Sequence, residues 1–276
     1  EIGYHFNEGG INSHGADGHK DGVSTWMQVG VQASNYGSYK DIMQYSFAAP
    51  QTNDTAYMQL SQARMYGAAI SDATHCVQIA GTVNTVNDSY VGTADIIPFT
   101  GGIGMATQVG SLHNARNYAV GASDGTNGLV GQGLTSGNNF TTEICQYQIS
   151  TGGVSNNVVG LSNEYVNSAT SDGSTAYFLG GYNSNPIRTI AFNSLSKNES
   201  HGTLRTNRAF AAATSNAEFA LLMGGSVTWA NASNNVDKLD FASSTTSTQY
   251  GSLALNNNIN SNCLLYTSPS PRDQRG

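Results

Sequence analysis

The stretch 171–181 reads SDGSTAYFLGG and combines a tight turn, a short apolar run and a pair of glycines. Asp and Gly favour a turn, because an Asp side chain can bond the backbone ahead of it and Gly accepts a positive φ. The apolar run has the length and aromatic character of a β-strand. The same order recurs without a gap at 71–81 (SDATHCVQIAG), 123–133 (SDGTNGLVGQG) and 215–225 (SNAEFALLMGG), and with a longer turn at 16–30. The closing glycines of the gapless copies are 44 to 52 residues apart, so the chain is built from repeats.

Two further patterns repeat in the same register. Seven positions before the turn serines stand Arg64, Arg116, Glu164 and Arg208. A segment of the form apolar-x-x-apolar-x-apolar begins at Ile42, Ala94, Ile144, Ile187 and Val236. No stretch shows sustained helical periodicity. Each repeat therefore predicts about four short strands, and the expected fold class is all-β, a β-propeller of four-stranded blades.

The repeat resembles the kelch repeat of the galactose-oxidase-type propellers. The points of resemblance are the double glycines at 180–181 and 224–225, the apolar strand that follows, and the small-residue segments after Arg64, Arg116 and Arg208. The third repeat departs most, with Glu164 in the Arg position. The resemblance implies a kelch-like propeller in which ligands bind through loops on one face.

The repeats predict one propeller domain over residues 1–262. Its blades are expected at about 30–80, 81–132, 133–180 and 181–224, with a composite fifth blade from 225–262 and 1–29. About five blades are visible, either a closed five-bladed ring or a fragment of a six- or seven-bladed one. Residues 263–276 break the composition with Pro269, Pro271 and two arginines and resemble a translated sequencing adapter, so we expect a non-native or disordered tail.

Composition and charge argue against several classes of partner. Charged residues make up 11% of the chain and the net charge is -7, which disfavours nucleic acid held through its phosphates. No apolar run approaches the roughly 20 residues of a membrane span, so membrane insertion is not expected. The oligomeric state and the compartment stay open, although sequons at Asn53, Asn87, Asn139, Asn198 and Asn231 favour an extracellular or surface-exposed location. Cys76 and Cys145 fall in predicted strands and are expected to be buried apolar residues.

The Arg position is the main candidate site. Around a closed ring, Arg64, Arg116 and Arg208, with Glu164 in the third repeat, would line the channel mouth and bind an anionic or glycan ligand. The alternative, favoured by the repetition, is that each Arg bonds carbonyls of its own or a neighbouring blade. His14, Asp17, His19 and Asp21 are weaker metal candidates, but they lack the spacing of a calcium loop, and no cofactor is expected.

The function expected from these features is a non-catalytic binding or scaffold module whose partner is a protein or a glycan. One alternative is a carbohydrate-active oxidase of the galactose-oxidase type, although no residue here matches its copper-binding motif. Another is a structural surface protein, such as a viral fibre or matrix component. No catalytic residue is expected, and the chain is more readily interpreted as a binding protein than as an enzyme.

Overall fold

The computed structural model describes residues 25–29, 39–46, 55–83, 89–99, 101, 103–137, 139–162, 168–216, 218–228, 231–243 and 246–253. Within these ranges the backbone forms strands, turns and irregular segments and no helix, so the all-β prediction is confirmed. In the same ranges, accordingly, no helix has the length and apolar character to cross a membrane.

Four antiparallel sheets have four strands each, hydrogen-bonded in the order in which they occur in the chain. The first strands are β4 (Ala68–Ser71), β9 (Val120–Ser123), β15 (Ser168–Ser171) and β19 (Ala212–Ser215). The second strands are β5 (His75–Thr82), β10 (Asn127–Gly131), β16 (Thr175–Gly181) and β20 (Phe219–Met223). The third strands are β6 (Tyr90–Pro98), β13 (Glu143–Gln148), β17 (Ser184–Ala191) and β23 (Asn235–Asp240). The fourth strands are β7 (Thr107–Ser111), β14 (Gly153–Gly160), β18 (Lys197–Thr203) and β24 (Thr248–Ser252).

Three smaller sheets complete the described part of the chain. A three-stranded sheet precedes the others and contains β1 (Thr25–Val29), β2 (Tyr39–Ser46) and β3 (Thr55–Arg64). A second joins β8 (Arg116–Asn117), β11 (Leu134–Thr135) and β12 (Asn139–Phe140), and the last pairs β21 (Ser226–Thr228) with β22 (Asn231–Ala232).

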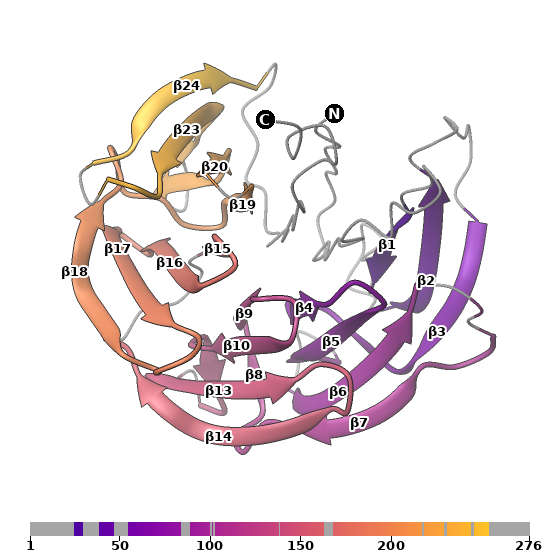
Figure 1. The fold of residues 1–276 in the computed structure, drawn as a ribbon. Helices are drawn as coiled ribbons and strands as arrows, with labels where there is room; N and C mark the ends of the chain where they lie inside the picture. Colours follow the sequence, from indigo (N-terminus) through magenta and orange to yellow (C-terminus); the bar gives the residue numbers. More distant parts are fainter. Residues whose placement is uncertain are drawn as a thin grey trace, which may run out of the picture.

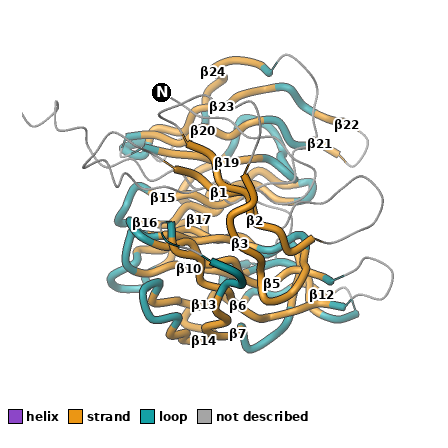
Figure 2. Tube along the Cα trace, turned by 90° about the vertical axis from the view of Figure 1, so that its right-hand side faces the viewer, coloured by secondary structure: helices purple, strands orange, loops and turns teal. Residues whose placement is uncertain are grey.

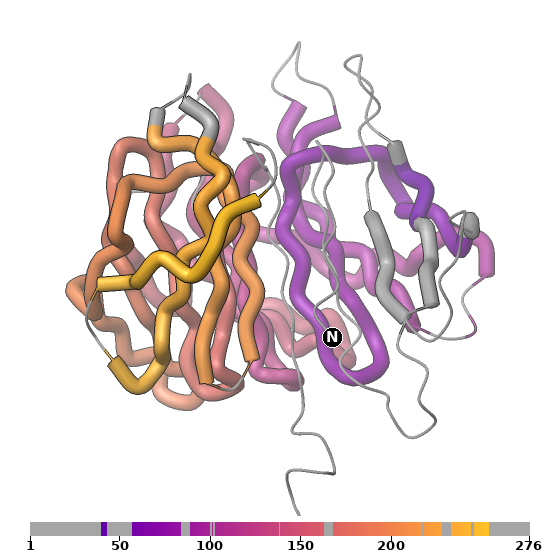
Figure 3. The backbone as a smooth tube through the Cα atoms, turned by 90° about the horizontal axis from the view of Figure 1, so that it is seen from above, coloured from indigo at the N-terminus to yellow at the C-terminus, as the bar shows by residue number. Residues whose placement is uncertain are grey.

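The sheets follow one another around an arc, with β4, β9, β15 and β19 on its inner side (Figure 1). Each of these first strands contacts the next one along the arc. Figure 3 shows coloured strands on the two sides of the arc, one side in purple and the other in orange and yellow, running in roughly the same up-and-down direction. The first strands can approach because they are fully buried and built from small residues; a Cβ on Gly121, for example, would lie 2.8 Å from the carbonyl oxygen of Ala69.

The hydrophobic core lies between consecutive sheets. Ile70 and Ile79 of the first four-stranded sheet pack with Val130 and Tyr147 of the second. Equivalent clusters lie between the second and third sheets and between the third and fourth sheets. Each four-stranded sheet therefore buries residues on both faces, which explains why the second strands β16 and β20 contain uninterrupted apolar runs. Cys145 lies in the first of these clusters, and Cys76 lies in a further cluster with Ile42 and Leu60 of the three-stranded sheet. Both are buried free thiols, as predicted, and burial raises the pKa of Cys76 to about 12.

The sheet boundaries differ from the predicted blades. The four-stranded sheets span 68–111, 120–160, 168–203 and 212–252, so the predicted boundaries near 80, 132, 180 and 224 cut each sheet after its second strand. The composite blade was also wrong for the described residues, because β1 pairs with β2 and residues 212–252 supply all four strands of their own sheet. A repeat reveals its period from any starting residue, whereas only the hydrogen bonds between strands reveal where a sheet begins.

Candidate functional site

The two ends of the four-stranded sheets carry different chemistry. We call the end where the first strand turns into the second the turn end, and the end marked by Gly81, Gly133, Gly181 and Gly225 the glycine end. At the turn end, Asp72, Asp124, Asp172 and Asn216 each accept backbone N–H groups from the residues two and three positions ahead, at 2.6–2.8 Å. The predicted Asp-centred turns are therefore confirmed, and these side-chain oxygens stabilise the scaffold.

Serines at the same end join one sheet to the next. Ser171 Oγ donates to the carbonyl oxygen of Ser123 at 2.6 Å, and Ser215 Oγ donates to that of Ser171 at 2.6 Å. All three residues are buried. The repeated turn serine thus forms a hydrogen-bonded link between neighbouring first strands, which its exposed appearance in a turn motif did not predict.

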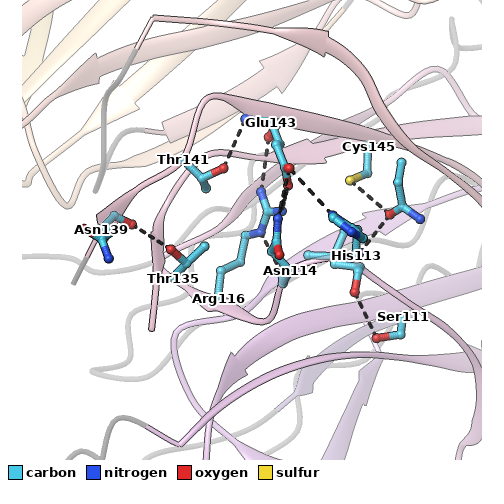
Figure 4. A network of polar contacts seen from close by, with 11 residues as sticks. Ser111, His113, Asn114, Arg116, Thr135, Asn139, Thr141, Glu143 and Cys145 are labelled. Carbon is cyan, nitrogen blue, oxygen red and sulfur yellow. Dashed lines mark hydrogen bonds and ion pairs between the residues drawn. The ribbon is translucent and has the colours of Figure 1, made fainter. Parts of the chain in front are cut away.

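The glycine end contains the repeated arginines. The side chains of Arg64, Arg116 and Arg208 are fully buried, and each Nη2 contacts a carboxylate on the third strand of the sheet that follows it. The partners are Asp95 at 3.1 Å, Glu143 at 2.7 Å and Asp237 at 2.8 Å. Figure 4 shows Arg116 pointing toward Glu143, with Asn114 bonded to the same carboxylate.

The Nη1 atoms of the arginines donate to one equivalent backbone carbonyl in each sheet. These carbonyls belong to Thr93 at 2.6 Å, Glu143 at 3.2 Å and Asn235 at 3.2 Å. Asp95 and Asp237 each lie two residues after the residue that supplies this carbonyl. Each pairs across the sheet with the residue three positions before the closing glycine of the second strand. In the second sheet that place is taken by Cys145, and Glu143, two residues earlier on the same face, supplies the carboxylate.

Further donors satisfy the remaining carboxylate oxygens. Asp95 accepts from the backbone N and the Oγ of Ser61, and Asp237 accepts from Nε and Nη2 of Arg205. Burial acts to raise the pKa of Glu143, but hydrogen bonds from Asn114 and Arg116 outweigh it and hold the pKa below its usual value. Burial lowers the pKa of Arg208, and the charge of Asp237 opposes that effect.

The expected ring of arginine donors at a channel mouth is therefore wrong for Arg64, Arg116 and Arg208. They bond backbone carbonyls and carboxylates within the protein. This arrangement agrees with the alternative stated above, in which each Arg bonds carbonyls of its own or a neighbouring blade. In the third sheet, Arg188 holds the register position of Asp95 and Asp237, and its Nε lies 3.1 Å from Glu199 Oε2. Its predicted counterpart Glu164 lies outside the described residues, as do His14, Asp17, His19 and Asp21. Within the described ranges, no group of three or more His, Cys, Asp or Glu is placed to hold a metal ion.

An aromatic cluster at the glycine end was not predicted from the sequence. Tyr66, Tyr118 and Phe210 each stand two residues after a repeated arginine, with φ angles of 58°, 52° and 52°. The ring centroids of Tyr66 and Tyr118 are 4.7 Å apart, and those of Tyr118 and Phe210 are 6.0 Å apart. Tyr182, which follows the double glycine of the third sheet, packs beside Phe210. The signal in the sequence was the recurrence of an aromatic residue two positions after Arg.

Two hairpins flank this cluster. β11–β12 and β21–β22 both follow a closing glycine, and Figure 2 shows β12 and β21–β22 on the same side of the molecule. The side chain of Phe140 on β12 is 49% exposed. In the third sheet, by contrast, β16 passes to β17 through a tight turn. The glycine end thus combines the aromatic cluster with the longer connections of the second and fourth sheets.

The described residues define an all-β protein assembled from repeated four-stranded sheets, three of which receive a buried arginine that pairs with a carboxylate on the third strand. No family model matches the chain, and no curated protein matches it.

Proposed function

We propose that the chain is a kelch-like β-propeller that acts as a non-catalytic binding module, with the glycine end as its binding face. The support for a propeller is the order of the sheets along the arc and the contact between successive first strands. The repeated length of the unit and the double glycines point the same way.

The observation that carries the binding role is the distribution of side chains at the glycine end. The repeated arginines at this end pair with carboxylates inside the protein, and three aromatic side chains, those of Tyr66, Tyr118 and Tyr182, are half-buried at the same end. Aromatic residues with a few polar neighbours are the usual lining of a recognition surface. The partner expected for such a surface is a protein or a glycan.

The test screens the purified chain on a glycan array and a peptide array, together with two matched variants. Phe140→Ser removes an exposed apolar side chain from the glycine end, and Ile103→Ser removes one, 88% exposed, from the turn end. We expect at least one ligand whose binding falls about tenfold or more in Phe140→Ser and is unchanged in Ile103→Ser. Absence of any ligand, or equal loss in both variants, would contradict the proposal.

Metal analysis separates this proposal from the oxidase alternative. The purified protein is assayed for bound copper and for peroxide release with galactose. Stoichiometric copper together with turnover would overturn the non-catalytic role.

A further inference from the structure

We propose that, among the acceptor sequences that the structure describes, the one at Asn198 is where the folded chain accepts an N-linked oligosaccharide. An Asn-x-Ser/Thr sequence is the acceptor for this modification. Three such sequences lie within the described residues, and they begin at Asn139, Asn198 and Asn231. The inference is independent of the proposed binding role, because Asn198 belongs to β18, which lies on the outer side of the arc (Figure 1).

The reaction sets two requirements for an acceptor. Nδ2 of the asparagine attacks the anomeric carbon of an oligosaccharide carried on a polyprenyl pyrophosphate. A carbon–nitrogen bond forms, the carbon–oxygen bond to the pyrophosphate breaks, and polyprenyl pyrophosphate leaves with the bonding electrons while Nδ2 loses one proton to solvent. The transferase must therefore reach the asparagine amide, and it must also reach the serine or threonine two residues later that completes the acceptor sequence.

The acceptor sequences in the two hairpins at the glycine end have a buried third residue. Thr141, after β12, is 8% exposed, and Ser233, after β22, is 7% exposed. The side-chain oxygen of each accepts the backbone N–H two residues ahead at 3.2 Å. The amide of Asn139 is engaged as well, since its Nδ2 donates to the carbonyl oxygen of Ser136 at 3.0 Å. The folded chain therefore does not expose a required side chain in either hairpin.

The acceptor sequence on β18 is open at both required residues. Asn198 and Ser200 are exposed, and β18 is the outermost strand of its sheet. Asn198 Oδ1 accepts the backbone N–H of Ser200 at 3.0 Å, whereas Nδ2 makes no hydrogen bond to any part of the chain that the structure describes. The amide is thus held through its oxygen while its nitrogen stays accessible.

The residue between them anchors this segment to the protein. Glu199 is half-buried, and its carboxylate accepts the backbone N–H of Ser162 and contacts Lys197 Nζ at 3.0 Å and Arg188 Nε at 3.1 Å. Residues 199–201 also fall outside the register of paired residues between β17 and β18, which marks a bulge. A bulge on an edge strand leaves the local backbone freer to adapt to an enzyme than a regular ladder does.

The experiment incubates the purified, folded chain with a solubilised oligosaccharyltransferase and a lipid-linked oligosaccharide. Peptides 134–144, 193–203 and 226–236 are incubated in parallel, because they report how well each sequence is accepted without the fold. Mass spectrometry gives the modified fraction at each asparagine, which is divided by the fraction in its peptide. We expect this ratio to be about tenfold or more higher at Asn198 than at Asn139 or Asn231, because buried acceptor residues are reached only through local unfolding.

Two variants control the measurement. Ser200→Ala should abolish modification of Asn198 without changing thermal unfolding, since it removes only an exposed hydroxyl group. Asn139→Gln is the matched control and should leave modification of Asn198 unchanged. Similar ratios at the three positions would overturn the proposal. It would also fail if Asn198 stayed unmodified in the folded chain, whether or not peptide 193–203 is accepted.

Discussion

At the scale of single residues, the buried arginines behave as structural groups. An ion pair taken out of water gains little net stability, but removing one partner leaves a buried charge uncompensated. Asp237 illustrates this, since its side chain is fully buried between Arg208, also fully buried, and Arg205, which is 33% exposed. The two arginines contact the same carboxylate, but Arg208 is fully buried and also donates to the backbone carbonyls of Gly224 and Asn235, whereas Arg205 is partly exposed.

Arg208→Ala should lower the free energy of unfolding by roughly 3–5 kcal/mol, because Asp237 loses its buried partner. Arg205→Ala should lower it by about 1 kcal/mol or less, since the pair is partly solvated and Arg208 stays in place. Chemical denaturation of both variants checks this. Equal effects would show that burial does not decide the role of the pair.

His201 makes stability depend on pH. Burial lowers its pKa from the ordinary value of 6.5, and Asp172 opposes this only in part. The folded chain therefore binds fewer protons at this site than the unfolded chain, and stability falls as the pH drops through about 6.5. His201→Phe, which keeps a ring against Tyr177, should flatten the curve between pH 7.5 and 5.5. Thermal unfolding across that range tests the expectation, which fails if the variant follows the parent.

At the scale of elements, the glycine that closes each second strand fixes how the chain leaves it. Gly225 has a φ of 81°, and a Cβ there would lie 2.5 Å from the carbonyl oxygen of Ala209. Ala209 and Ser226 exchange backbone hydrogen bonds next to Gly225. A side chain at position 225 would therefore strain the contact between the segment before β19 and the start of β21.

Gly225→Ala should destabilise the protein by roughly 1–3 kcal/mol, since both the φ angle and the space exclude a side chain. Gly251→Ala is the control, because nothing lies within 4 Å of its added Cβ. Its effect should remain within about 0.5 kcal/mol. Melting temperatures of the two variants give the comparison, and a similar drop in both would argue against the described turn.

At the scale of the whole molecule, burial decreases from the inner to the outer side of the arc. All residues of β4, β9, β15 and β19 are buried, whereas β7, β14, β18 and β24 are exposed or half-buried throughout. The inner strands also carry the serine links between sheets.

Amide hydrogen exchange should follow this gradient. We expect the slowest exchange in the four first strands and the fastest in the four outer strands, because local opening is easiest where few contacts are lost. Exchange measured by mass spectrometry on overlapping peptides resolves the two groups. Uniform protection across both groups would contradict the described packing.

The all-β class, the four strands of each repeat, the Asp-centred turns and the recurrence of the arginines could all be predicted from the sequence. These features depend on local chemistry and on spacing along the chain, which a repeated sequence displays directly. The binding role expected of the arginines was wrong, because the position of a residue in a repeat does not reveal its burial.

The sequence by itself determined the strands, the turns and the period of the repeat. Only the tertiary structure decided where each sheet begins, that Arg64, Arg116 and Arg208 meet carboxylates 27 to 31 residues away, and that Tyr66, Tyr118 and Phe210 gather at one end. The physical reason is that hydrogen bonds between strands and the packing of neighbouring sheets join residues that are far apart in the chain. Secondary-structure propensity depends only on nearby residues and therefore does not determine those contacts.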